Sequence, residues 1–220
     1  MKIFDGLHGF LWTSASANNC NAYLIDGAAR ILIDPGHLRL FEHVERGLEE
    51  IGIGLADIDL VIVTHAHPDH LEAVKLIKER SSALFAINET DWNLVTEMSR
   101  YLPMSQGFEA VTPDFFLREG DLAVKDIALR VVPAPGHSPG SVCIHWSGKK
   151  ALFTGDVLFK DGLGRTDLPG GDGSALKASI RRLSTLDLEW VLPGHGGFVS
   201  GADEVRINFT RVEQAWFAYI

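Results

Sequence analysis

One short apolar run limits the fold of this 220-residue chain more than any other feature of its sequence. Residues 60–63 are Leu-Val-Ile-Val, a pattern typical of a strand that is buried on both faces. A polar segment, residues 64–70, follows this strand directly, and an amphipathic helical pattern comes after it. The sequence therefore predicts a sheet covered by helices, with polar groups where the strand ends.

The other predicted strands fall into two groups, each followed by helices. In addition to residues 60–63, strands are expected over residues 21–26, 30–33, 83–87, 122–124, 128–132, 142–146, 151–154 and 190–192. Helices are expected over residues 38–51, 71–78, 88–100, 203–219 and from an N-cap at Ser174 to about Ser184. The helix over 71–78 is expected to bury Leu71, Val74 and Ile77. The helix over 203–219 carries Val205, Phe209, Val212 and Trp216 on one apolar face, which is expected to be buried. Residues 101–116, rich in proline and aromatic side chains, predict a long loop or lid. Because no linker divides the chain, residues 1–220 are expected to form one domain of two β-rich layers covered by helices.

Charge and cysteine content limit the partners and the compartment. The chain has 20 basic and 29 acidic side chains, a net charge of −9, which argues against a protein that binds the nucleic-acid backbone. Cys20 and Cys143 lie in apolar, strand-like contexts and are predicted to be buried free thiols, as in a reducing compartment. The first residues lack the apolar segment of a signal peptide, and no apolar run approaches the ~18 residues of a membrane span. A cytoplasmic protein without a membrane partner is expected.

The polar segment after residues 60–63 has the composition of a metal site. It reads Thr-His-Ala-His-Pro-Asp-His, so that His65, His67, Asp69 and His70 fall within six residues. His65 and His67 are two residues apart in extended backbone and point the same way, and Asp69 and His70 then open a helix. Neutral imidazole and carboxylate are ligands for Zn, Mn or Fe rather than for Ca. The alternative is a polar turn with incidental histidines, but the pattern favours a transition-metal site.

Three further strand ends carry ligand-type side chains. His137 lies in a tight loop between two strands, Asp156 follows the strand at residues 151–154, and His195 follows the strand at residues 190–192. Each has an ordinary alternative role, as a loop histidine, a turn aspartate or an N-cap. Together with residues 64–70, however, four strand ends deliver polar ligands to one face, which indicates a metal site on a β scaffold. Asp34, after another buried strand, is expected to bond a ligand histidine or to cap its turn.

The order of these motifs resembles the metallo-β-lactamase superfamily, from Asn21 to about Gly197. The segment at residues 162–172 is similar to that of the glyoxalase II-like hydrolases, especially the short bacterial forms. The resemblance implies an α+β fold, a four-layer αββα sandwich, which agrees with the two groups of strands. It also implies a ligand set for two metal ions: the first held by His65, His67 and His137, the second by Asp69, His70 and His195, with Asp156 bridging them.

The activity implied by the resemblance is metal-dependent hydrolysis of thioesters such as S-acylglutathione. Two divalent transition metal ions are the expected cofactors, with zinc as first choice and iron or manganese as alternatives. Asp69, beside the attacking water, and the bridging Asp156 are the expected catalytic residues. Arg165 falls at a cationic position of the family loop and is expected to bind an anionic small-molecule substrate. Its alternative role is that of a surface arginine.

Other members of the superfamily give competing functions. Persulfide dioxygenases, which resemble glyoxalase II, use one iron ion, here on His65, His137 and Asp156. The Gly-His-Gly turn at residues 194–196 is more similar to that of the hydrolases. Flavodiiron oxidoreductases need a flavin domain and nucleases a basic clamping face, and neither is visible in the sequence. The complete histidine set favours glyoxalase II-like chemistry over β-lactam hydrolysis, and over a metal-binding module without catalysis.

Overall fold

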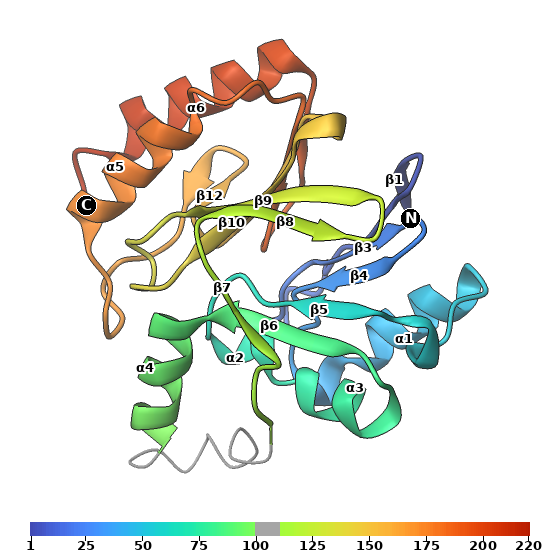
Figure 1. Cartoon of the computed structure of the whole chain (residues 1–220). Coiled ribbons are helices and arrows are strands. Elements are labelled where there is room, and N and C mark those ends of the chain that lie inside the picture. Colours follow the sequence, from blue (N-terminus) through green and yellow to red (C-terminus); the bar gives the residue numbers. More distant parts are fainter. Residues whose placement is uncertain (100–110) are drawn as a thin grey trace. The chain divides into compact units, whose positions relative to one another are not determined.

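The computed structural model describes residues 1–99 and 111–220, which divide into two compact units. The first unit comprises Met1–Leu117 with Val124–Ile127, and the second comprises Arg118–Ala123 with Ala128–Ile220. Each unit contains one large sheet with helices packed against it (Figure 1).

The sheet of the first unit has seven strands in the order of the sequence. They are β1 (Lys2–Phe4), β2 (Leu7–Phe10), β3 (Ala22–Asp26), β4 (Arg30–Ile33), β5 (Leu60–Ile62), β6 (Leu84–Asn88) and β7 (Phe115–Leu117). Neighbours from β1 to β4 are antiparallel, whereas neighbours from β4 to β7 are parallel. Because parallel neighbours need a crossover connection, helices occupy the chain between these strands. The helices are α1 (Glu42–Glu50), α2 (Pro68–Leu71), α3 (Val74–Arg80) and α4 (Glu89–Ser99).

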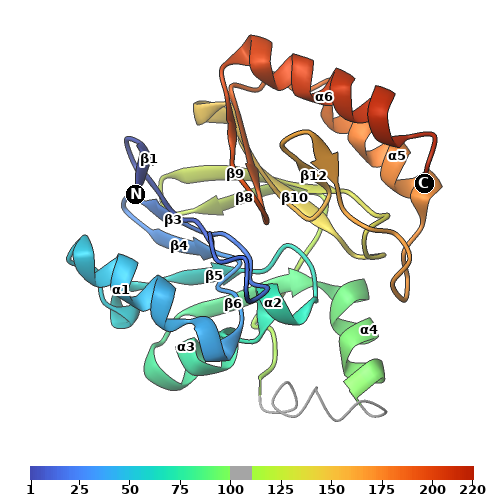
Figure 2. The same cartoon turned by 180° about the vertical axis from the view of Figure 1, so that it is seen from behind.

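Helices α1 and α3 lie side by side against this sheet (Figures 1 and 2). Their apolar residues recur at spacings of three and four, so that Val44 and Leu48 of α1 and Val74 and Ile77 of α3 are buried in the core. Strand β5 is buried along its whole length, as its apolar run predicts. Because β4, β5 and β6 are parallel, their carboxyl ends meet at one edge of the sheet.

Asp114 ties β6 to the chain just before β7. Its carboxylate accepts hydrogen bonds from the Phe85 N–H at 2.7 Å and from Lys78 Nζ at 2.8 Å. Burial alone raises the pKa of this carboxyl, but the hydrogen bonds from Lys78 and Phe85 outweigh it, and the pKa lies below its ordinary value.

The sheet of the second unit has six strands in the order β15-β14-β11-β10-β9-β8. They are β8 (Gly120–Val124), β9 (Ile127–Pro133), β10 (Val142–Trp146), β11 (Ala151–Gly155), β14 (Trp190–Pro193) and β15 (Val199–Ser200), and a small separate sheet pairs β12 (Leu158–Phe159) with β13 (Gly162–Leu163). Strands β11 and β14 are parallel, so both end at the same edge of the sheet.

Helices α5 (Gly173–Leu183) and α6 (Ala202–Trp216) cover the second sheet and lie side by side in both views (Figures 1 and 2). Leu176 and Ile180 of α5 and Val212 of α6 pack in one core with Leu152 and Val191 of the sheet. The second unit therefore repeats the scheme of the first, with a sheet whose face is buried by amphipathic helices.

Most predicted elements are confirmed, nearly all within one or two residues. Helix α1 begins four residues later than predicted, after a 3₁₀ turn at Leu38–Leu40, and α6 ends three residues earlier than predicted. The hairpin of β3 and β4, the buried strand β5, the helices α1, α4 and α6, and the strands β8 to β11 and β14 lie where the periodicity places them. The predicted helix over residues 71–78 is two short helices, α2 and α3, with Leu71, Val74 and Ile77 buried as expected.

Three predictions were wrong in detail. Residues 115–116, expected in a loop, belong to β7, while residues 101–110 of that predicted loop lie outside the described residues. The N-cap of α5 is Asp172, which accepts the Ala175 N–H at 3.0 Å, and not Ser174. Trp216, expected on the buried face of α6, is 43% exposed, because its indole N–H reaches out to the Asp161 carbonyl.

Cys20 and Cys143 are buried free thiols, as predicted. Among the described helices, none is long and apolar enough to cross a bilayer. The division into two units leaves the single domain over residues 1–220 a prediction.

Candidate metal centre

In the first unit, residues 64–70 pass from the end of β5 into α2. His67 is the N-cap of α2 in extended backbone, and Pro68 occupies the first helical position, where its missing N–H costs nothing. The segment therefore has an extended half that carries His65 and a helical half that carries Asp69 and His70. This is the strand-to-helix arrangement that the sequence predicts.

The side chains of this segment have the spacing of metal ligands. His65 Nε2 lies 3.1 Å from His67 Nδ1, close to the about 3.3 Å between two nitrogen ligands of one tetrahedral zinc ion. The rings of His65 and His70 are 4.1 Å apart between centroids, and the ligand atoms of Asp69 and His70 lie within 4.8 Å of each other. This donor set of imidazole and carboxylate suits a transition metal.

Asp34 organises this half of the site from the end of β4. Its buried carboxylate accepts three hydrogen bonds: from the Thr64 N–H at 2.8 Å, from Thr64 Oγ1 at 2.8 Å and from His70 Nδ1 at 2.9 Å. The structure thus gives Asp34 the first of its two expected roles, a bond to a candidate ligand histidine.

These contacts fix which ring nitrogens carry protons. A carboxylate only accepts, so His70 Nδ1 carries its proton and Nε2 presents a lone pair. The Thr64 hydroxyl gives its proton to Asp34 and accepts from His65 Nδ1 at 3.1 Å, which leaves a lone pair on His65 Nε2 as well. Both rings are therefore held in the tautomer that binds metal through Nε2.

Two residues that the sequence analysis did not single out support this segment. The amide of Asn18 donates to Asp69 Oδ2 at 2.7 Å. Asp91, fully buried in the first turn of α4, accepts the Ala66 N–H at 2.9 Å. The sequence held one sign of Asp91: an acidic residue next to the apolar Trp92, on the face of the helix that packs against the core.

In the second unit, Asp156 and His195 come together because their strands run parallel. Gly155 at the end of β11 pairs with Pro193 at the end of β14, and the Gly194 N–H donates to the Gly155 carbonyl at 2.8 Å. Asp156 directly follows β11 and His195 is the second residue after β14, so the two side chains lie close together, with His195 Nε2 3.3 Å from Asp156 Oδ2.

His137 approaches the same carboxylate from the loop between β9 and β10. Its Nε2 lies 3.6 Å from Asp156 Oδ2, and its Nδ1 donates to the Arg165 carbonyl at 2.7 Å. Because a carbonyl only accepts, Nδ1 carries the proton and Nε2 presents its lone pair. One oxygen of Asp156 therefore lies beside two candidate ligand histidines.

Gly164 allows the loop after β13 to lie against these residues. A Cβ at this position would overlap the carbonyl oxygen of Asp156 and come within 2.9 Å of His137 Nδ1. Only glycine fits such a close approach. Gly164, which carries part of the family resemblance, thus serves the candidate site.

The guanidinium of Arg165 binds Asp167. Its Nε and Nη2 donate to the two carboxylate oxygens of Asp167, both at 2.7 Å, and the Arg165 side chain is 61% exposed. This hydrogen-bonded pair lowers the pKa of Asp167 to about 2. In the structure, the backbone carbonyl of Arg165 accepts a hydrogen bond from His137 Nδ1. The role of the Arg165 side chain in substrate binding stays a prediction.

The histidines outside these motifs lie away from the candidate ligands in the structure of their own unit. His8 is in β2, His43 in α1 and His145 in β10, and His37 bonds Glu72 at 2.7 Å. Burial lowers the pKa of His145, which keeps this strand histidine neutral.

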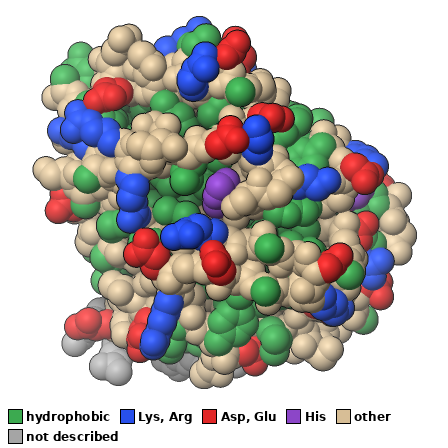
Figure 3. Space-filling view, turned by 45° about the horizontal axis from the view of Figure 1, so that its top comes forward, with side chains coloured by type: hydrophobic (Ala, Val, Ile, Leu, Met, Phe, Trp, Pro, Cys, Tyr) green, Lys and Arg blue, Asp and Glu red, His purple; other side chains and the backbone are tan. Residues whose placement is uncertain are grey.

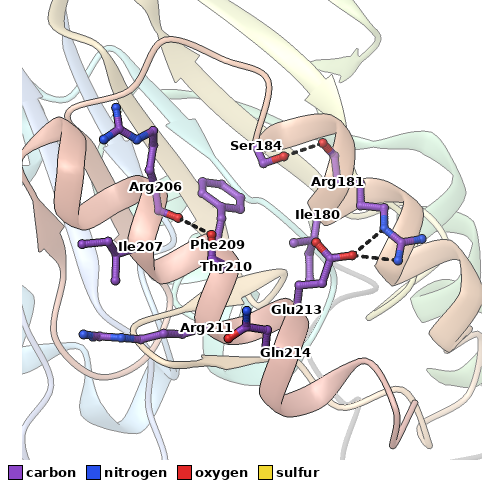
Figure 4. A pocket seen from close by; sticks show the side chains of 10 residues that line it. All are labelled: Ile180, Arg181, Ser184, Arg206, Ile207, Phe209, Thr210, Arg211, Glu213 and Gln214. Carbon is purple, nitrogen blue, oxygen red and sulfur yellow. Dashed lines mark hydrogen bonds and ion pairs between the residues drawn. The ribbon is translucent and has the colours of Figure 1, made fainter.

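A cavity of about 560 Å³ between α5 and α6 contains none of the candidate ligands (Figure 4). Three arginines line it, and each is paired with a carboxylate: Arg181 with Glu213, Arg206 with Asp203 and Arg211 with Asp161. These pairs are exposed and join surface groups of the second unit. The arginines that line this cavity therefore belong to surface ion pairs, and none of the residues that line it is a candidate metal ligand.

Comparison with known proteins identifies the family. The model of the metallo-β-lactamase superfamily matches residues 15–195, a range that includes all seven candidate ligands. The hydroxyacylglutathione hydrolase GloC of Haemophilus influenzae is 33% identical over 205 residues, which cover 89% of this chain and 93% of that protein. The probable metallo-hydrolase MJ0888 of Methanocaldococcus jannaschii is 36% identical over 186 residues, 80% of this chain and 87% of the relative.

Solved structures agree with this match. The crystal structure of TTHA1623 in a di-iron-bound form is similar with a TM-score of 0.71 and 34% sequence identity, over 86% of this chain and 93% of that one. The predicted fold class is thereby confirmed: two major sheets flanked by helices, in the metallo-β-lactamase fold.

Proposed function

Because the chain belongs to the metallo-β-lactamase superfamily, we propose that it is a binuclear metal-dependent hydrolase of thioesters such as S-acylglutathione. The proposal assigns the first ion to His65, His67 and His137, and the second to Asp69, His70 and His195. Asp156 serves both ions. The assignment transfers the family pattern to positions that carry the same residue types in this chain.

The position of Asp156 is the observation that carries the binuclear proposal. Its Oδ2 lies 3.6 Å from the His137 nitrogen and 3.3 Å from the His195 nitrogen, and these histidines are assigned to different ions. A carboxylate oxygen between one ligand of each ion is suited to bridge them. A centre with one iron on His65, His137 and Asp156 has no use for His195 at this place.

The chain's own residues prepare the site for hydrolysis. Bound divalent metals supply Lewis acidity for an acyl carbonyl and make water acidic enough to react at neutral pH. The carboxylate of Asp69 accepts a hydrogen bond from the amide of Asn18, which fixes its position. Its proposed role is to orient the reacting water. Asp34 accepts the hydrogen bond of His70 Nδ1 and so leaves Nε2 as the nitrogen that faces a metal. No nucleophilic side chain is needed.

Zinc is the metal we propose first, since the donor set of histidine and carboxylate with lone pairs on Nε2 suits it. Iron suits the same donors, and the di-iron form of the relative TTHA1623 supports it as the alternative, with manganese third.

The proposed substrate class follows from the relative GloC, a hydroxyacylglutathione hydrolase. Glutathione thioesters carry carboxylates, and Arg165 is the proposed cation for them. Its bond to Asp167 must then open or be shared when substrate binds.

The proposed partners are small molecules. Basic and acidic side chains are interspersed on the face shown in Figure 3, in keeping with the net charge of −9 and with a protein that does not bind nucleic acid. The two buried free thiols support a cytoplasmic location. We further propose that residues 1–220 act as one domain, since the family match extends across both units.

Hydrolysis of an S-acylglutathione by metal-free and zinc-loaded protein tests the proposal. We expect activity only after loading, and its loss in Asp156→Ala, because one carboxylate serves both ions. Asp203→Ala is the matched control, since Asp203 is an aspartate of the same unit with an 81% exposed side chain. Undiminished hydrolysis by Asp156→Ala would refute the binuclear mechanism. Oxygen consumption with a persulfide, in place of hydrolysis, would favour the mononuclear iron alternative.

A further inference from the structure

Asp91 is a fully buried carboxylate with no assigned role in the proposed chemistry. Burial of a carboxylate is costly unless the group accepts hydrogen bonds, and here its Oδ2 accepts the Ala66 N–H at 2.9 Å. Ala66 lies between the candidate ligands His65 and His67, and 25 residues before Asp91 in the chain.

The backbone around Ala66 has left the sheet and has not yet entered a helix. The last sheet-like bond before it runs from the Val63 N–H to the Ala86 carbonyl, and α2 begins after His67. Between these points, the Thr64 N–H is held by Asp34 and the Ala66 N–H by Asp91. Side-chain carboxylates therefore replace the backbone acceptors that a strand or a helix would supply.

The topology explains why these two carboxylates meet the segment from opposite sides. Strand β5 lies between β4 and β6, and all three are parallel. Asp34 directly follows β4, and Asp91 lies in the first turn of α4, which directly follows β6. Each neighbour of β5 thus contributes one aspartate at the edge where β5 ends.

We propose that Asp91 is a positioning residue that fixes the backbone carrying His65 and His67, and thereby the affinity for the first metal ion. Asp34 has the corresponding role for His70, whose ring it bonds directly. Asp91 acts on the backbone between two ligands of the first proposed ion, whereas Asp34 bonds a ligand of the second directly and reaches His65 through the Thr64 hydroxyl. This inference rests on the proposed function, since it uses the same ligand assignment.

A purely structural role for Asp91 is the competing explanation. An acidic residue in the first turn of a helix stabilises it through the helix dipole, whatever it contacts outside. Glu89 lies in the same first turn of α4 and carries the same charge, but it is exposed, whereas Asp91 is buried. Glu89→Gln therefore removes a charge from the same helix end and leaves the bond to Ala66 in place, which makes it the matched control.

Zinc titration of metal-free protein against a competing chelator tests the proposal. In Asp91→Ala we expect the affinity of one of two zinc equivalents to fall about ten- to a hundredfold, the range typical for loss of a group that orients ligands. Asp91→Asn is expected to lose less, because its amide oxygen still accepts the Ala66 N–H but without charge. Glu89→Gln is expected to bind zinc as the wild type does.

The outcomes separate the inference from the proposed function. Wild-type affinity for both equivalents in Asp91→Ala overturns the role of Asp91, as does an equal loss in Glu89→Gln. If Asp91→Ala does not fold, Asp91→Asn decides: a severalfold loss at one equivalent supports the proposal, and wild-type affinity overturns it. A wild-type protein that takes up no zinc contradicts the proposed function itself.

Discussion

Asp34→Asn is the substitution that tests the hydrogen-bond network of the site most cleanly. Asp34 has a left-handed backbone with φ of 52°, and asparagine tolerates this conformation as well as aspartate does. The side chain keeps its shape and loses only one acceptor oxygen and the charge. Any loss of stability then reports the three hydrogen bonds that the carboxylate accepts.

The expected magnitude follows from those bonds. The amide oxygen of asparagine can accept the Thr64 N–H, which leaves the new NH₂ group facing the Thr64 hydroxyl and His70 Nδ1. Two buried donors without acceptors cost about 1–3 kcal/mol each. The threonine hydroxyl and the histidine tautomer can both readjust, so we expect the lower part of that range, about 2–4 kcal/mol in all. For a chain of this size this corresponds to a fall in Tm of roughly 4–16 °C.

Thermal unfolding of the metal-free protein is the assay, because bound metal adds its own stabilisation. Asp5→Asn is the control: Asp5 has a 92% exposed side chain in the same unit, and its Tm should stay within about 2 °C of the wild type. A metal-free Asp34→Asn protein with the Tm of the wild type would mean that Asp34 does not hold Thr64 and His70 as described.

Four further substitutions test other parts of the molecule. Gly164→Ala should lower zinc affinity at least tenfold, because its Cβ overlaps the Asp156 carbonyl, whereas Gly148→Ala, with open space around it, should not; equal affinities would contradict the close packing. Asp114→Asn should be less stable than the wild type by about 1–2 kcal/mol at pH 7 in urea unfolding. The pKa of Asp114 is lower in the folded than in the unfolded state, so the stability difference between wild type and variant is fully present above the unfolded pKa of about 3.9. It should vanish as the pH falls through the folded pKa. A stability difference that grows in acid would contradict this account of Asp114. Arg165→Ala should raise KM for an anionic thioester by less than about fivefold, since the side chain is exposed, and Asp167→Asn should lower that KM by freeing the guanidinium. An unchanged KM in both variants would show that Arg165 does not bind the substrate.

The candidate ligands could be proposed from the sequence because each depends on a local pattern. An apolar run followed by a polar residue marks a strand end, and parallel strands bring their ends to one edge. This logic applies to Asp156 and His195 in the second unit, and to the segment from His65 to His70 in the first. The helical and strand periods also give the core faces of α1, α3 and α5, where apolar spacing decides which side is buried.

Residues that support the ligands escaped prediction because their contacts are remote in the chain. Asn18 bonds Asp69 across 51 residues, and Asp91 bonds Ala66 across 25. Neither spacing has a period that a sequence pattern reveals. Local ambiguity explains the N-cap of α5, since Asp172 and Ser174 are both good caps two residues apart and only the bond to Ala175 decides.

Short elements were missed for a similar reason. Strands β12, β13 and β15 have two residues each, which is too few to show an alternating pattern. Trp216 shows the opposite failure: the helical period correctly placed it on a stripe with Val212, but the stripe reaches the surface at the end of α6, where the indole bonds a carbonyl.

The metal content of the wild-type protein tests the central claim most directly. Protein stripped of metal and then dialysed against zinc should contain two equivalents per chain by elemental analysis. Seven histidine and aspartate side chains are assigned to those two ions, with Asp156 serving both. A protein that retains one equivalent, with no increase on adding zinc, iron or manganese, would contradict the binuclear centre.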